Sequence, residues 1–206
     1  IVCCADSALE SHARLGYRRD RMVVIPNGFD LQTLQPDPVG RTELRRQLGL
    51  DNDTLIIGMC GRFEPQKDHQ NLIRAAGLLH RRAPAAHFAL WGDGITAENH
   101  ILREWILGQG LQDCVHLLGY RADSPYINTC LDMATLSSAY GEAFPNVIGE
   151  AMACAVPCVV TDVGDAAHIV GPTGIVVPPR DPQALAEAWL KLLERPEQER
   201  LRLGQE

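Results

Sequence analysis

The sequence predicts an α/β fold in which helices cover both faces of a doubly wound parallel sheet. Strand-like apolar runs alternate with helical patterns along the 206 residues, as in successive βαβ units. The apolar runs are continuous rather than alternating, which is typical of strands buried on both faces. Right-handed crossovers between such strands give an open, Rossmann-like sheet that binds ligands beyond the carboxyl ends of its strands.

The elements are expected in a regular order, with apolar runs as strands and amphipathic stretches as helices. The expected strands are 1–5, 22–25, 54–60, 87–91, 115–118, 131–136, 158–161 and 175–177. The expected helices are 7–17, 41–49, 68–82, 97–108, 123–130, 146–155, 182–194 and 196–204, with a short helical turn near 165–169.

Both ends of the chain resemble cut ends. The first 20 residues offer one strand and one helix without a sheet of their own, and the last helix stops at Glu206 without a tidy ending. We therefore expect residues 1–23 to be a remnant of a preceding domain and residues 24–206 to form a C-terminal domain.

Composition indicates a globular protein with an aliphatic core. Hydrophobic residues make up 46%, charged residues 22% and aromatic residues only 5%. The net charge of −7 argues against nucleic acid or anionic membranes as partners. No apolar run reaches the roughly 18 residues of a membrane span. The seven cysteines lack zinc-site spacing, which favours reduced, buried thiols in a cytoplasmic protein.

Two cations follow the strand at 54–60. Gly61 permits a tight turn or a close approach of a ligand to the backbone, and Arg62 and Lys67 flank the loop that leads into the next helix. Two cations beside a helix start are suited to binding an anion. The alternative on position alone is two solvated surface cations.

Two further loops carry glycine at the carboxyl end of a strand. Gly92 begins a Gly-Asp-Gly loop after the strand at 87–91, and Gly119 precedes Tyr120 and Arg121 after the strand at 115–118. Each lets backbone approach a ligand, although Asp-Gly is also a common turn.

The stretch 141–157 is the most informative part of the chain. Glu142 lies in a loop, Pro145 suits a first helical turn, and Glu150 lies on the order of 7 Å further along the helix axis. Carboxylates at two depths can accept hydrogen bonds from two polyol groups, and the amides of a helix start point toward the same crevice. The alternative is a helix that carries one exposed glutamate near its start.

Taken together, these segments resemble the family 4 (group 1) retaining glycosyltransferases of the GT-B fold, and their wording resembles the enzymes of bacterial polysaccharide assembly. The resemblance covers residues 24 to 190, in the family's order. The matching segments are IPNGFD (25–30), GRFEPQKDH (61–69), GDG (92–94), LGY (118–120), GEAFPNVIGEAMA (141–153) and TGIVVPPRDPQALAEA (173–188).

The resemblance implies a role for each matching residue. Arg62 and Lys67 would hold the donor diphosphate, and with Glu142 they form the catalytic set. Glu150 would bind the ribose, and Glu142 with the backbone of 144–147 would bind the transferred sugar. The implied donor-binding residues are Gly61, Arg62, Lys67, Gly92, Tyr120, Arg121, Glu142, Phe144, Pro145, Asn146, Val147 and Glu150.

The sequence departs from the family's pattern at a few positions. Ala143 and Ala155 stand where glycine is common, and a methyl group at 143 would crowd the sugar. His168 stands where Glu or an apolar residue is usual, and we expect an ordinary, partly buried histidine rather than a catalytic one. The Asp-x-Asp string at 51–53 is expected to be a turn rather than a metal site.

The resemblance predicts transfer of a hexose from a nucleoside-diphosphate sugar to an acceptor hydroxyl with retention. A UDP-sugar is favoured over a GDP-sugar, and no metal or other cofactor is expected. The missing N-terminal domain would bind the carbohydrate or lipid-linked acceptor, so this chain alone would be inactive. The protein would be cytoplasmic or peripheral at the inner membrane face. The alternatives are a nucleotide-sugar epimerase, a phosphorylase, or a non-catalytic domain that binds sugar nucleotides.

Overall fold

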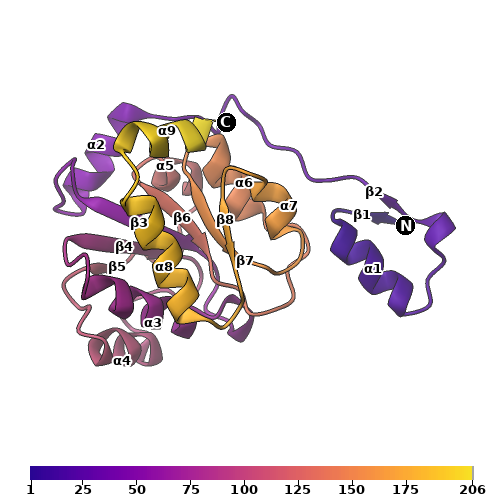
Figure 1. Cartoon of the computed structure of the whole chain (residues 1–206), viewed down its shortest axis with the longest axis horizontal. Coiled ribbons are helices and arrows are strands. Elements are labelled where there is room, and N and C mark those ends of the chain that lie inside the picture. The colour runs from indigo at the N-terminus through magenta and orange to yellow at the C-terminus, as the bar shows by residue number, and fades with distance from the viewer. Residues whose placement is uncertain (206) are drawn as a thin grey trace.

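A six-stranded parallel sheet forms the centre of the molecule in the computed structural model (Figure 1). The structure describes residues 1–205, without the side chains of 124, 125, 197, 201 and 205. The strands lie in the order β5-β4-β3-β6-β7-β8, and every neighbouring pair is parallel. Their bounds are β3 Leu55–Cys60, β4 Ala86–Trp91, β5 Val115–Leu117, β6 Met133–Leu136, β7 Cys158–Thr161 and β8 Ile175–Val177. The predicted doubly wound fold is confirmed.

Helices cover both faces of this sheet (Figure 1). One face packs against α3 (His69–His80), α4 (His100–Gly108) and α8 (Pro182–Leu193). The other packs against α2 (Pro38–Gln47), α5 (Ser124–Asn128), α6 (Asn146–Ala153) and α7 (Ala166–Val170). The last helix is α9 (Glu197–Gln205).

The sheet has an apolar core on each face because side chains alternate along a strand. Phe88 and Leu90 of β4 belong to the core beneath α3 and α8, whereas Ala89 and Trp91 belong to the core beneath α2 and α6. Buried strands with two apolar faces explain the continuous apolar runs in the sequence.

The strand order reverses direction between β3 and β6. From β3 the chain winds outward to β4 and β5, and β6 then returns to the other side of β3 before β7 and β8. The loops after β3 and β6 therefore leave the sheet in opposite directions, and they open a crevice between them. Lys67 follows β3 and Glu142 follows β6.

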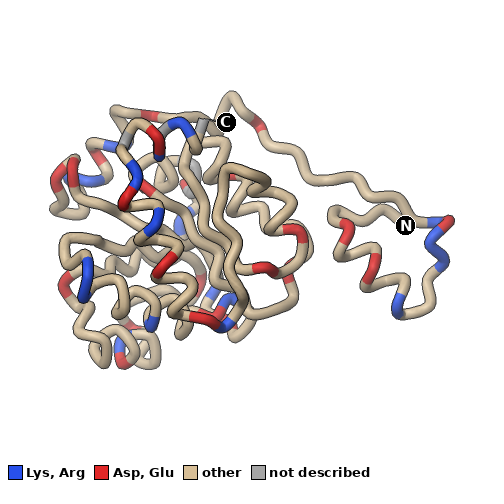
Figure 2. The backbone as a smooth tube through the Cα atoms, viewed as in Figure 1, with Lys and Arg blue, Asp and Glu red and all other residues tan. Residues whose placement is uncertain are grey.

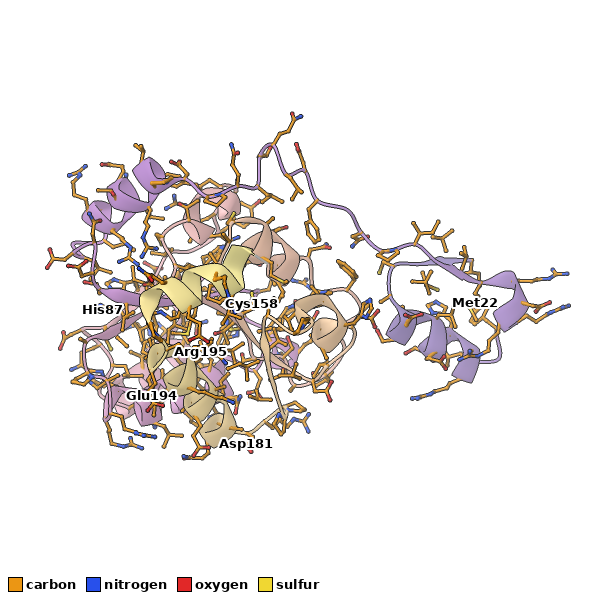
Figure 3. The ribbon with its side chains drawn as sticks, turned by 45° about the horizontal axis from the view of Figure 1, so that its top comes forward. Met22, His87, Cys158, Asp181, Glu194 and Arg195 are labelled. Atoms are coloured by element: carbon orange, nitrogen blue, oxygen red, sulfur yellow. The ribbon has the colours of Figure 1, made fainter. Side chains whose placement is uncertain are left out.

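A small N-terminal unit projects from one side of this body and contacts it through the start of α1 (Figure 1). It contains β1 (Val2–Cys3), α1 (Asp6–Arg14), the 3-10 helix η1 (Arg19–Arg21) and β2 (Val23–Val24), and the two strands pair in parallel. Figure 3 shows Met22 in this unit, distant from Cys158 in the central sheet. An extended segment, residues 25–37, joins the unit to α2.

The expected element order is confirmed, with shifts of a few residues at the boundaries. Shifts of three residues occur at the end of α1 and at the starts of α2 and α4. Helix α2 begins at Pro38 rather than 41 because the Asp37 carboxylate accepts the amides of Val39 and Gly40. A proline in the first turn after such a cap is a standard helix start.

Two further observations concern the distribution of charge and the length of the helices. Figure 2 shows Lys and Arg interspersed with Asp and Glu over the main body in this view. Among the described residues, no helix combines the length and the apolar character needed to cross a membrane.

Candidate functional site

A cavity of about 750 Å³ lies beyond the carboxyl ends of the central strands. The loops after β3, β4 and β5, the first turns of α6 and part of the segment before α2 form its walls. Eight of the residues predicted from the sequence line it: Gly61, Arg62, Lys67, Gly92, Tyr120, Arg121, Val147 and Glu150.

Four predicted residues do not line this cavity: Glu142, Phe144, Pro145 and Asn146. They form the segment between β6 and α6 and meet the cavity only indirectly. Glu142 does so through Lys67, and Pro145 is buried. The structure therefore brings the diphosphate-binding candidates into one space and holds the sugar-binding candidates beside it.

Lys67 and Glu142 form a largely buried ion pair at the topological switch point. The Lys67 Nζ atom lies 2.6 Å from Glu142 Oε1, and the two side chains are only 14% and 8% exposed. The Ser138 hydroxyl donates to the same oxygen at 2.5 Å. Both contacts use Oε1, so among the described contacts Oε2 is left to accept from a ligand. An ion pair with this little exposure fixes both side chains.

A short helix and two side-chain hydrogen bonds hold the loop that carries Lys67 in place. Residues Pro65–Lys67 form the 3-10 helix η2, and Asp68 follows in the left-handed region with φ of 48°. The Asp68 carboxylate caps α3 by accepting the Asn71 amide at 3.1 Å. The Lys67 carbonyl also accepts from Ser137 at 2.7 Å, which joins the loop to the end of β6.

Gly92 permits the close packing of two loops at the cavity floor. Its φ is 142°, and a Cβ atom there would lie 2.2 Å from the Gly61 carbonyl oxygen. Because only glycine tolerates that approach, the loops after β3 and β4 meet backbone to backbone. The close approach seen here is to the loop after β3, and the approach of a ligand to this glycine stays a prediction.

Arg62 lies at the open side of the cavity. Its guanidinium is 3.0 Å from Glu64, and the two side chains are 64% and 40% exposed. Such an exposed pair contributes little to stability and exchanges readily with other anions.

Glu150 and the start of α6 supply the acceptor and donor groups of the site. Burial raises the pKa of Glu150 above its ordinary value. No described side chain caps the start of α6. Pro145 has no N–H, so the donors of this segment are the amides of Phe144, Asn146 and Val147.

Tyr120 and Arg121 form the rim on the β5 side. Tyr120 is 75% exposed. Arg121 donates to Asp123 at 2.7 and 2.6 Å, and this hydrogen bonding raises the pKa of Arg121 and lowers that of Asp123. The Arg121 side chain is thus paired within its own loop, and both residues line the cavity.

His69, which follows the Lys67 loop, is a buried titratable group outside the predicted site. It is 2% exposed and packs against Phe63 with ring centroids 5.6 Å apart. Burial, together with the charge of Lys67, lowers the pKa of His69 to about 4. The side chain is therefore neutral at neutral pH.

Sequence reasoning missed part of the cavity wall. Asp30, Thr33 and Leu34 line it, although the resemblance implies no donor-binding role for any of the three. The Asp30 carboxylate accepts from the Gln32 amide and the Thr33 hydroxyl, which folds the linker into a turn. The strand ends Cys60 and Trp91 and the loop residues Asp93 and Ala122 complete the lining.

Other expectations have mixed outcomes. His168 is exposed, so the expectation of a partly buried histidine is wrong; it lies on the outer side of α7. The Asp-x-Asp string is a turn, in which the Asp51 carbonyl accepts the Thr54 amide, as predicted. Ala155 has φ of 60°, in the region that favours glycine.

The cysteines and the metal-ligand residues give two further observations. None of the seven cysteines forms a disulfide, and five of them are buried. No three His, Cys, Asp or Glu residues gather into a metal-binding group in the part of the chain that the structure describes.

Comparison with known proteins gives one family. The family model described as glycosyl transferases group 1 matches residues 54–195. D-inositol 3-phosphate glycosyltransferase from Corynebacterium jeikeium is 32% identical over 82% of this chain and 43% of its own length. Alpha-D-kanosaminyltransferase from Streptomyces kanamyceticus is 34% identical over 76% of this chain and 41% of its own length.

Solved structures agree with these relatives. HepE from Anabaena, in complex with UDP-glucose, superposes with a TM-score of 0.89 and 28% identity, over 98% of this chain and 56% of that one. The chain thus spans less than half the length of the curated relatives named above.

Proposed function

The chain belongs to the group 1 glycosyltransferases, and we propose that it is the donor-binding part of an enzyme that transfers a hexose with retention. The donor is a nucleoside-diphosphate sugar, with UDP favoured over GDP. The acceptor is a carbohydrate or lipid-linked hydroxyl bound by the preceding domain of the whole protein.

The observation that carries this proposal is the Lys67–Glu142 pair beside the cavity. It places a fixed cation where a doubly wound sheet binds its ligand, between the loops after β3 and β6. Arg62 lies on the same wall of the cavity. Two cations form charge-assisted hydrogen bonds with a diphosphate, whereas a neutral ligand would form weaker hydrogen bonds with both.

The cations act on the departing diphosphate. In the transfer, the bond between the sugar C1 and the β-phosphate oxygen breaks, and its electron pair stays on the diphosphate. The acceptor oxygen bonds to C1 on the same face, and its proton passes to the departing oxygen. Lys67 and the amides at the start of α6 stabilise the negative charge that develops, whereas the exposed Arg62 mainly holds the diphosphate, and no metal ion takes part.

The remaining contacts follow from position in the cavity. Glu150 accepts hydrogen bonds from the ribose hydroxyls one to two turns into α6. Tyr120 and Arg121 border the base at the rim. Glu142 does not line the cavity, and its role comes from the resemblance: Oε2 would accept from a hydroxyl of the transferred sugar while Oε1 holds Lys67 and Ser138.

The proposed setting is the assembly of a bacterial polysaccharide. The relatives named above are transferases that act on other molecules, so the acceptor is a proposal from the resemblance alone. The enzyme would work in the cytoplasm or at the inner face of the membrane.

Calorimetry with this chain tests donor binding. UDP should bind at millimolar concentration or below, more tightly than GDP, and without added metal ion. Absence of binding by either nucleotide would contradict the proposal and favour a structural domain. Product analysis with the full-length protein then tests the reaction, because release of an epimerised sugar or of a sugar phosphate would contradict transfer.

A further inference from the structure

A carboxylate of the main body caps the helix of the N-terminal unit. Asp165 Oδ2 accepts the Asp6 amide at 2.8 Å, and Oδ1 accepts the Ser7 amide at 3.0 Å. The residue at the N-cap position of α1 is Ala5, and no side-chain cap of its own is present. The first amides of a helix need such acceptors, and a negative charge there is favourable. Asp165 therefore supplies, from 158 residues away, the cap that α1 lacks.

The Asp165 carboxylate is suited to this contact. Burial alone would raise the pKa of Asp165, but the hydrogen bonds from Ser7 and Asp6 and the charge of His168 outweigh it, so the pKa lies below its ordinary value. The side chain is only 9% exposed and stays charged at neutral pH.

The backbone of the same residue holds the segment that carries Glu142. The Asp165 amide donates to the Ala143 carbonyl at 2.9 Å, and the Ser7 hydroxyl reaches that carbonyl at 3.5 Å. Gly164 has φ of 62°, and a Cβ atom there would lie 2.5 Å from the Glu142 carbonyl oxygen. The backbone on either side of Asp165 thus lies directly against Glu142 and Ala143.

The linker contacts the other end of this segment. The Asn27 side chain donates to Asn146 at 2.8 Å, and the Phe29 ring stacks on Phe144 with centroids 6.2 Å apart. Residues 1–30 therefore contact the segment 143–146 at both ends, through Ser7 and through the linker.

We propose that Asp165 is a positioning residue that couples the docking of the N-terminal unit to the conformation of the Glu142–Asn146 segment. Its carboxylate binds α1 while its backbone binds Ala143, so the segment is held most firmly when the unit is docked. The inference rests on the proposed function for its consequence: the order of the sugar-binding segment depends on the position of the preceding domain.

Hydrogen exchange of the 206-residue chain, followed by mass spectrometry, tests the coupling. In Asp165→Ala, the amides of the first turn of α1 and those of peptide 142–148 should both exchange faster, by about fivefold, the effect of losing one helix cap. Asp165→Asn keeps one acceptor oxygen and should give a smaller increase in both places. It carries the test if the alanine variant does not fold.

Asp37→Ala is the matched control. Asp37 also accepts two helix amides, those of Val39 and Gly40 at the start of α2, and none of its described hydrogen bonds reaches α1 or the 142–148 peptide. Its loss should speed exchange in α2 alone. If it also speeds exchange in 142–148, or if Asp165→Ala speeds exchange only in α1, Asp165 is merely a helix cap and the coupling is wrong.

Binding of UDP to the wild-type chain is measured on the same preparation. Absence of UDP binding would contradict the proposed function, but the exchange rates would still show whether Asp165 couples the two segments. A wild-type rate in peptide 142–148 of Asp165→Ala would remove the coupling while leaving UDP binding intact. The two failures are therefore distinct.

Discussion

The two cations that line the cavity differ in exposure and in the position of their partners. We call the Lys67 side of the cavity its closed end and the Arg62 side its open end. Lys67 is 14% exposed and pairs with a residue 75 positions away, on the loop after another strand. Arg62 is 64% exposed and pairs with Glu64, two positions away in its own loop. The first pair is part of the tertiary structure, and the second is a local surface contact.

The difference indicates that the two cations have different functions in the proposed anion site, one in turnover and one in binding. A cation already fixed and shielded from water stabilises a developing charge without reorganisation, and salt screens it weakly. An exposed arginine must leave its partner and is screened by solvent, so it contributes mainly to binding. We therefore expect Lys67 to govern turnover and Arg62 to govern affinity.

The largest expected effect is that of Lys67→Ala on turnover. Removing one transition-state donor costs about 10²–10³ in rate, so kcat of the full-length enzyme should fall by that factor. The chain contains one other lysine, the exposed Lys191 of α8, and Lys191→Ala should leave kcat unchanged. Near-normal turnover in Lys67→Ala would overturn the assignment.

A second variant separates catalysis from folding in that experiment. Lys67→Ala leaves the carboxylate of Glu142 buried without its cation, which also destabilises the fold. Adding Glu142→Gln removes that charge and should restore part of the thermal stability, measured as Tm, but none of the turnover.

The next effect is a loss of stability in acid that comes from the buried His69, two residues after Lys67. Its pKa is about 4 in the folded chain, against about 6.5 when unfolded, so the unfolded state takes up the proton first as the pH falls. The contribution of neutral His69 to the free energy of unfolding is fully present above about pH 6.5. It decreases as the pH falls from about 6.5 to about 4, by about 3 kcal/mol between pH 7 and pH 4.

Urea unfolding at several pH values measures this effect. Carboxylates also titrate in the window, so the quantity of interest is the difference between wild type and His69→Asn. That difference should shrink toward pH 4, whereas the exposed His100→Gln should follow the wild-type curve. In Lys67→Met the neighbouring charge is gone, so the pKa of His69 should rise and the acid-induced loss should become smaller.

The contrast between the two ends also marks what the sequence could predict. Alternation of apolar runs and helical patterns was enough for the doubly wound fold, and glycines after strands located the cavity. The local pair of Arg62 and Glu64 could be anticipated from their spacing. The pair of Lys67 and Glu142 could not, because it depends on the path of the loop after β6 and on Ser138, which holds the same oxygen.

The errors have similar causes. The expected start of α2 at 41 is three residues late, because apolar periodicity does not register the cap at Asp37 or the first-turn proline at Pro38. Asp30 and Thr33 line the cavity because the segment before α2 lies against the ends of the central strands. Such a contact of an irregular segment has no periodic pattern in the sequence. His168 was expected to be partly buried, yet in a helix of five residues its exposure depends on which side faces the body.

The smallest expected effect is that of Arg62→Ala, and it tests the open end. Loss of an exposed charge contact of about 1 kcal/mol should weaken UDP binding about fivefold at low salt, with kcat nearly unchanged. Because salt screens exposed charges, the difference from wild type should decrease as ionic strength rises, whereas the effect of Lys67→Ala should persist. Calorimetry at two salt concentrations measures both, with the exposed Arg103→Ala of α4 as the control. A loss of kcat in Arg62→Ala as large as in Lys67→Ala would show that the two cations act as one catalytic unit, and the division between the closed and open ends would be wrong.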